Sequence, residues 1–196
     1  MPNLNTVVEN DANALATYAR LFWDRLELEE LTLENGVDHT PTQVEYQPED
    51  FLTVLVTDRG VGAGLYLKGA RFTGHDGLAG KLGHFRIDRM SDALACRCGK
   101  RGCVEAYASP HGLLKRLNPI FTNLAAAAKA RDSKALEIFA EGGTTLGIAL
   151  SYAINIVGPR GIAIFAPPAL VHEVDHGASR AYWIEGLFPP PLGPFN

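Results

Sequence analysis

The stretch "GHFRIDRMSDALACRCGKRGCVEAY" at residues 83–107 contains all three cysteines of this 196-residue chain. Cys96, Cys98 and Cys103 are so close in sequence that their thiolates can converge only if the chain doubles back sharply. Gly99 and Gly102 can supply the positive backbone angles that such a turn needs. An odd number of cysteines argues against a closed set of disulfides and is typical of a reducing compartment. The stretch therefore predicts a use for the thiols other than disulfide bonding.

One histidine near the start of this stretch can complete a set of metal ligands. Three thiolates and one neutral imidazole make the tetrahedral set that zinc occupies in structural sites. The cations Arg97, Lys100 and Arg101 would offset the net charge of about -1 that such a site carries. We therefore predict a zinc knuckle over residues 84–103, with the ligands His84, Cys96, Cys98 and Cys103. The alternative is three reduced loop cysteines beside a surface histidine.

Composition places the chain among compact folded proteins, because 46% of its residues are hydrophobic and 20% are charged. Its net charge of -4 gives no general attraction to nucleic acid or to anionic lipid. The start "MPNLNTVVEND" has no signal-peptide pattern, and the apolar run "LGIALSYAINIVG" (146–158) is too short and too polar to span a bilayer. We expect a cytoplasmic protein that binds neither membranes nor, by itself, nucleic acid.

The first half of the chain shows one clear helix and one clear hairpin. Apolar residues at three-and-four spacing predict a helix from about residue 11, with Asn10 and Asp11 as capping candidates. Residues 6–8 are predicted to end a strand, and the acidic residues 27–50 to form an excursion over the surface. "FLTVLVT" (51–57) and "AGLYLKG" (63–69) read as two strands joined by "DRGVG".

The second half is mainly helical. Helices are predicted from about residue 104, through much of 111–131, and over 133–157, where "GPRG" stops the last of them. "IAIFA" (162–166) is predicted as a short buried strand, 177–187 as a final helix and 189–196 as a frayed, proline-rich tail. Strands and helices in this order predict one α/β domain over residues 1–188.

Three segments carry a resemblance to a known family. "VENDANALA" (8–16), "RGVGAGLYLKGARFTGHDGLAGKLGH" (59–84) and "CRCGKRGCVEAYAS" (96–109) resemble, in order and spacing, the ROK family of bacterial sugar kinases and sugar-responsive repressors. The resemblance covers most of residues 5–170. It implies an actin-like, hexokinase-like ATPase fold, mainly its second lobe. It also implies a sugar or sugar-phosphate ligand, a structural zinc, a homo-oligomer and, in the kinases only, ATP with Mg²⁺.

The resemblance assigns roles to individual residues. Asp11 matches the general base of the kinases, and Asn10 a sugar ligand. His84 matches a zinc ligand whose other edge faces the sugar, and Glu105 a carboxylate that accepts sugar hydroxyl groups. A loop that approaches the ATP phosphates in the kinases matches Gly60, Gly62 and Gly64. From the residues alone, a helix cap, a purely structural ligand, a solvated glutamate and an ordinary glycine hairpin remain open for these positions.

The sequence departs from the family pattern at several positions, and the arginine at position 59 is more like the regulators than the kinases. Lys81 stands where the family has a sugar-binding glutamate, and Arg59 stands where kinases have a small hydroxyl residue. The sequence begins almost at the "ND" motif, so we expect an N-terminally truncated member without the first lobe or a helix-turn-helix. "IFAPPALV" (164–171) replaces the family's late glycine pair.

The predicted function is the sugar-sensing effector domain of a ROK-type regulator that lacks its DNA-binding segment. The alternatives are a glucokinase-like, ATP-dependent sugar kinase and a non-functional fragment.

Overall fold

The computed structural model describes residues 9–22, 28–32, 36–42, 49–167 and 170. In chain order the elements are α1 (Asp11–Phe22), β1 (Leu28–Thr32), β2 (Gly36–Thr42), β3 (Phe51–Val56), β4 (Val61–Leu67), β5 (Ala70–Phe72), the 3-10 helices η2 (His75–Gly77) and η3 (Leu82–His84), α2 (Val104–Ala108), α3 (Pro110–Arg116), α4 (Leu124–Ala130), α5 (Ser133–Val157) and β6 (Gly161–Phe165). The mixture confirms the predicted α/β class.

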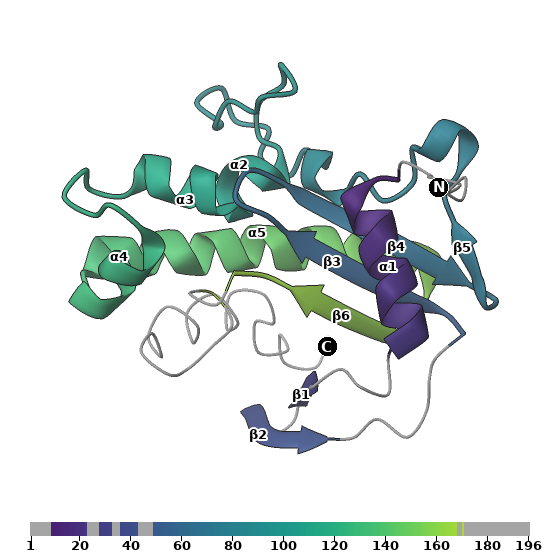
Figure 1. Cartoon of the computed structure of the whole chain (residues 1–196). Coiled ribbons are helices and arrows are strands. Elements are labelled where there is room, and N and C mark those ends of the chain that lie inside the picture. The colour runs from purple at the N-terminus through teal and green to yellow at the C-terminus, as the bar shows by residue number, and fades with distance from the viewer. Residues whose placement is uncertain (1–8, 23–27, 33–35, 43–48, 168–169, 171–196) are drawn as a thin grey trace, which may run out of the picture.

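The central sheet has four strands in the order β5-β4-β3-β6 (Figure 1). β3 pairs antiparallel with β4 and parallel with β6. The register places Val56 opposite Val61, so residues 57–60 form the connection. Thr57 N donates to Gly60 O at 2.9 Å, and Gly60 N donates to Thr57 Oγ1 at 3.1 Å. This confirms the predicted hairpin.

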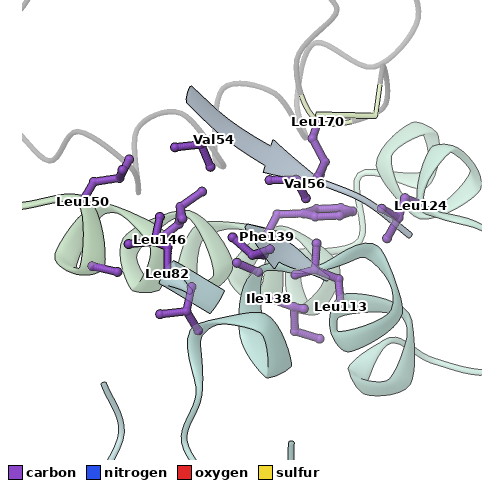
Figure 2. Packing of buried hydrophobic residues seen from close by; sticks show 14 of the residues in the cluster. Val54, Val56, Leu82, Leu113, Leu124, Ile138, Phe139, Leu146, Leu150 and Leu170 are labelled. Carbon is purple, nitrogen blue, oxygen red and sulfur yellow. The ribbon is translucent and has the colours of Figure 1, made fainter. Parts of the chain in front are cut away.

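Helices cover both faces of the sheet. α1 crosses one face of β3 and β4, while α5 runs along the other (Figure 1). The side chains of β3 alternate accordingly, because Leu52, Val54 and Val56 join the core with α5, whereas Phe51 packs with α1. Phe139 of α5 lies fully buried at the centre of the larger core (Figure 2). The hairpin therefore serves as the middle layer of a three-layer structure.

Two glycines let α1 lie close to the sheet. A Cβ at Gly64 would be 2.4 Å from the Ala12 carbonyl oxygen, and one at Gly62 would be 3.0 Å from the Ala12 Cβ. Residues two apart in a strand share a face, so both glycines lie under the helix. Ala12 and Ala16, both buried, are the matching small residues of α1. This packing holds the N-terminal end of α1 beside the hairpin.

Residues 27–50, predicted only as an excursion over the surface, contain two strands. β1 and β2 pair antiparallel with each other in a separate two-stranded sheet. Main-chain hydrogen bonds form such a ladder, so it needs no alternation of apolar side chains that would mark it in the sequence.

The single helix predicted within 111–131 is two helices. Pro119 lies in the break and has no N–H to continue the first helix. Asn123 then caps the second, because its Oδ1 accepts from Ala126 N at 2.8 Å. Pro119 and the capping Asn123 therefore divide the segment into two helices, although the spacing of its apolar residues suggested one.

The later elements follow the prediction with one change. α5 ends at Val157 and is capped by Gly158, which has φ 60°, as the glycine stop predicts. β6 is half buried, with only Ala163 fully enclosed, and so is less buried than predicted. The strand end at 6–8, the helix at 177–187 and the tail at 189–196 lie outside the described residues. No helix among the described residues has the length and apolar character needed to cross a membrane.

Candidate metal centre and adjacent cleft

The cysteine loop doubles back as its glycines predict. Gly99 has φ 86° and Gly102 has φ 78°. Cys96 N donates to Lys100 O at 2.8 Å, and Gly102 N donates to Leu94 O at 2.8 Å. These bonds bring the two arms of the loop together and place the three thiols on one side.

The four predicted ligands meet in one cluster. The ligand atoms of His84, Cys96, Cys98 and Cys103 all lie within 4.8 Å of one another. Cys98 Sγ is 3.7 Å from Cys103 Sγ, and Cys96 Sγ is 3.9 Å from His84 Nδ1. A tetrahedron with metal–sulfur bonds of about 2.3 Å has edges of about 3.8 Å. The cluster therefore fits a metal ion, and its three sulfurs and one nitrogen form a closed set.

The pKa values of the three thiols are shifted in different directions. Burial raises the pKa of Cys96 to about 12 and also raises the pKa of Cys103. The backbone N–H of Lys100 holds the pKa of Cys98 below its ordinary value. A bound metal ion needs thiolates, so metal binding would release protons from the two buried thiols.

Tyr107, which was not identified from the sequence as important, stabilises the cysteine loop through its hydroxyl group. Leu94 N donates to Tyr107 Oη at 3.0 Å, and the Tyr107 hydroxyl donates to Asp88. Tyr107 belongs to α2, so the helix is tied to two points of the chain that precedes Cys96. No local pattern marks this role, because the sequence does not show which distant groups a buried tyrosine hydroxyl will contact.

A cleft of about 150 Å³ lies beside the cluster of His84 and the three cysteines. Its lining comes from the start of α1, the hairpin, the loop before η3 and the start of α2. The predicted site residues that line it are Asn10, Asp11, Gly60, Gly62, His84 and Glu105. Gly64 lies instead beneath α1. Lys81 also lines the cleft, so the departure from the family pattern lies inside the site.

The start of α1 presents one carboxylate to the cleft. Asn10 Oδ1 accepts from Ala12 N at 3.2 Å, and Asn10 O accepts from Ala14 N at 2.9 Å. Asn10 is thus the residue that caps the helix. Asp11 is exposed and accepts only from the adjacent Ala12 N, at 2.8 Å, among the hydrogen bonds described for it. Its second carboxylate oxygen is therefore available to a ligand.

Glu9 holds Asn10, the residue that caps α1, in place. This role was not identified from the sequence. Its Oε1 accepts from Asn10 N at 2.9 Å and from Asn13 Nδ2 at 3.2 Å, and Arg71 lies 2.8 Å from its other oxygen. The Asn10 backbone N–H is the largest cause that lowers the pKa of Glu9. The position of this glutamate directly before a capping asparagine is the sequence signal that could have indicated its role.

Glu105 contacts the predicted metal ligand Cys96 and also lines the cleft. It is only 7% exposed, so it is not the solvated glutamate that its helix-start position left open. The Cys96 thiol donates to Glu105 Oε1 at 3.4 Å, and Arg97 Nη2 lies 3.8 Å from the same oxygen. A buried carboxylate held in this way can accept hydrogen bonds without reorganising.

Sequence comparisons include both repressors and kinases. The chain is 30% identical over 131 residues to the DNA-binding transcriptional dual regulator NagC of Escherichia coli, a match that covers 59% of this chain and 32% of the regulator. It is 39% identical over 71 residues to an N-acetylmannosamine kinase of Vibrio cholerae, covering 36% of this chain and 24% of the kinase. The chain thus spans a third or less of these relatives.

The fold and the family agree. The structure resembles the ROK hexokinase of Thermus thermophilus with a TM-score of 0.65 and 26% identity, over 91% of this chain and 54% of the hexokinase. This supports the hexokinase-like, actin-type architecture expected from the motifs. The ROK family model matches residues 41–167, which is more than half of the chain, so this protein belongs to the ROK family.

Proposed function

We propose that this chain is a sugar-binding effector domain of the regulator type in the ROK family. The observation that carries the proposal is the cleft in which Asn10, Asp11 and Glu105 meet beside His84. Carboxylates and amides bind sugar hydroxyl groups by accepting and donating hydrogen bonds from fixed positions. The cleft offers two carboxylates and one amide from segments far apart in sequence.

Two cations favour the regulator over the kinase. Lys81 lies in the cleft, and an ammonium group donates hydrogen bonds but accepts none. Arg59 occupies the exposed bend of the hairpin, where a phosphate loop needs a close backbone approach. Lys81 replaces a sugar-binding glutamate, and Arg59 replaces a small hydroxyl residue of the phosphate loop, so two groups that the family's kinases use for phosphoryl transfer are replaced.

Sugar binding is tested by calorimetry. The panel contains N-acetylglucosamine, xylose, N-acetylmannosamine and glucose. We expect one of them to bind, and Asp11→Asn and Glu105→Gln each to weaken binding by about tenfold, the cost of one charge-assisted hydrogen bond. Asp132→Asn, which changes a helix cap outside the cleft, is the matched charge control. Absence of binding to the whole panel, or equal loss in the control, contradicts the proposal.

The kinase remains the second candidate because Asp11 presents an unpaired carboxylate oxygen to the cleft at a helix start. In a kinase, that carboxylate would accept the proton of the sugar hydroxyl, and Gly60 and Gly62 would lie nearest to the phosphates of ATP. We expect ATP-dependent turnover near background with the same sugars. Readily measured turnover that disappears in Asp11→Asn would place the kinase above the regulator.

We further propose that the metal is zinc and that its role is structural. A closed set of three sulfurs and one nitrogen suits zinc and leaves no position for a reacting group. Protein purified without a histidine tag should contain about one zinc ion per chain. Cys103→Ala should lose the metal and much of the folding stability, since binding energy is folding energy in such sites. Lys100→Ala, in the same loop, is the control, and metal-free protein of unchanged stability would contradict the proposal.

A regulator domain of this composition is not expected to bind DNA by itself. The chain has a net charge of -4, and nonspecific affinity for DNA depends on neutralised phosphates. A gel-shift assay with the promoter of a neighbouring sugar operon tests this. Salt-sensitive, sequence-specific binding by these 196 residues would overturn the expectation.

A further inference from the structure

We propose that Cys98 is an oxidation site at which hydrogen peroxide drives the formation of a disulfide bond between Cys98 and Cys103. The two Sγ atoms lie 3.7 Å apart. Cys98 is exposed, whereas Cys103 is fully buried. An accessible thiol with a second thiol poised beside it is the arrangement by which proteins sense oxidants. The difference in exposure assigns the reaction with the peroxide to Cys98 and the closure of the bond to Cys103.

The surroundings of Cys98 suit a reactive sulfur. Arg97, Lys100 and Arg101 flank it, and all three are exposed. Cysteines that react with oxidants lie in such electropositive, accessible settings. The next residue leaves space for the oxidant, because a Cβ at Gly99 would meet nothing within 4 Å. A small peroxide can therefore reach the Cys98 sulfur from solvent.

Cys96 is not placed for the same reaction. It is only 8% exposed, and its thiol donates to Glu105 Oε1 at 3.4 Å. One residue separates it from Cys98, so a bond between these two would close a small ring far from ordinary disulfide geometry. Four residues separate Cys98 from Cys103, enough for a turn that joins them without such strain. The favoured pair is therefore Cys98 and Cys103.

Only a small movement is needed to close the bond. The two Sγ atoms must approach from 3.7 Å to about 2.05 Å. Cys103 directly precedes α2, where Val104 N donates to Phe85 O at 3.0 Å, so its backbone is held. Cys98 lies in the exposed turn of the loop, so the movement falls to Cys98.

The reaction balances with hydrogen peroxide as the oxidant. The Cys98 thiolate attacks one peroxide oxygen, which forms a sulfur–oxygen bond, breaks the oxygen–oxygen bond and releases hydroxide. The Cys103 thiolate then attacks the Cys98 sulfur, which forms the disulfide, breaks the sulfur–oxygen bond and releases a second hydroxide. The two sulfurs together lose two electrons, and the peroxide gains them. Both hydroxides take protons from solvent and become water.

The disulfide would remove two of the four predicted metal ligands and leave His84 and Cys96. Two ligands do not make the tetrahedral set that a structural zinc ion needs, so the site would no longer retain it. This consequence rests on the structural zinc proposed above, whereas the bond itself requires only the two thiols. The zinc content before oxidation therefore tests the metal separately.

Peroxide treatment of the full chain, purified under reducing conditions and without a histidine tag, tests the proposal. Trypsin cleaves after each of the three flanking cations, so Cys98 and Cys103 fall on different peptides, residues 98–100 and 102–115. After free thiols are blocked, we expect mass spectrometry to find these peptides joined, and to find them separate once a thiol reductant is added. A chromophoric chelator should detect the release of about one zinc ion per chain over the same period.

Single variants assign the roles of the two cysteines. In Cys103→Ser, Cys98 should stop at the sulfenic acid and be labelled by dimedone. Cys98→Ser should show neither this label nor the joined peptides. Cys96→Ser changes the third cysteine ligand and should still form the bond, which separates loss of a metal ligand from loss of a thiol partner.

Met90→Leu is the control for oxidation elsewhere in the loop, because Met90 is 70% exposed and can itself be oxidised. It should leave both the bond and the zinc release unchanged. Absence of the joined peptides, a dimedone label on Cys96 in place of Cys98, or zinc release that disappears in Met90→Leu would each overturn the proposal. Zinc-free protein that still forms the bond would contradict the structural zinc alone and would support the oxidation site.

Discussion

Gly99 and Gly102 have the same left-handed backbone in very different surroundings. A Cβ at Gly99 would meet nothing within 4 Å, whereas one at Gly102 would be 1.8 Å from the Asp88 carbonyl oxygen. Both positions cost an L-residue about 1–2 kcal/mol of backbone strain. Only Gly102 adds a clash with backbone that is itself held, since Ile87 N donates to Gly102 O at 2.9 Å.

This contrast gives a prediction for a matched pair of variants. Gly99→Ala should lower the free energy of unfolding by about 1–2 kcal/mol, and Gly102→Ala by more than about 3 kcal/mol because the loop must also shift. Urea denaturation of the two proteins measures the difference. Equal stabilities would mean that the loop is not held as the structure describes.

At the scale of elements, the contact of α1 with β4 decides whether the cleft forms. Gly64→Ala should push α1 away from the sheet, because the new methyl group would be 2.4 Å from the Ala12 carbonyl oxygen. Asp11 lies at the start of the same helix, so we expect sugar affinity to fall about tenfold or more as its carboxylate is displaced.

Gly62→Ala is the graded comparison for this prediction. Its Cβ would meet the side-chain atom Ala12 Cβ at 3.0 Å, which a small adjustment can relieve. Calorimetry should therefore show a smaller loss of sugar affinity than in Gly64→Ala. A larger loss in Gly62→Ala would contradict the packing argument.

The tie between α2 and the cysteine loop makes stability depend on pH. The hydrogen bond from Tyr107 is the main cause that lowers the pKa of Asp88 below its ordinary value of 3.8. A lowered carboxyl pKa contributes stability that is present above the unfolded value and is lost as the pH falls through the folded value. This contribution is therefore present at neutral pH and disappears below about pH 4.

Tyr107→Phe should destabilise the protein at pH 7, and the difference from the unchanged protein should shrink as the pH falls below about 4. Urea denaturation at a series of pH values measures it. Tyr152→Phe, an exposed tyrosine of α5, is the control and should show no such trend. A loss of stability that is independent of pH would mean that the hydrogen bond to Asp88 does not contribute, and would leave Tyr107 its packing and its bond from Leu94 N.

At the scale of the whole molecule, α5 supplies the core against which the sheet and the smaller helices pack. Phe139 is fully buried and Ile156, on the same helix, is 80% exposed. Phe139→Ala should lower the free energy of unfolding by about 3–5 kcal/mol through lost burial and the cavity left behind. Ile156→Ala should change it by less than about 0.5 kcal/mol. Thermal or urea unfolding distinguishes the two, and a comparable loss in both would indicate that the exposed face of α5 is covered in solution.

The sequence by itself determined the features that depend on neighbouring residues. The cysteine loop, the hairpin, the cap at Asn10 and the glycine stop of α5 each follow from residues only a few positions apart. The family motifs also lie within such short segments, so membership in the ROK family could be predicted before the fold was known.

Only the tertiary structure decided what distant segments do together. It buried Glu105, which local sequence left as a solvated residue, because the cysteine loop folds over the start of α2. It placed Gly64 beneath α1 and outside the cleft, because both Ala12 and Ala16 of the helix pack over this glycine. Burial depends on distances between segments, and spacing along the chain does not specify those distances.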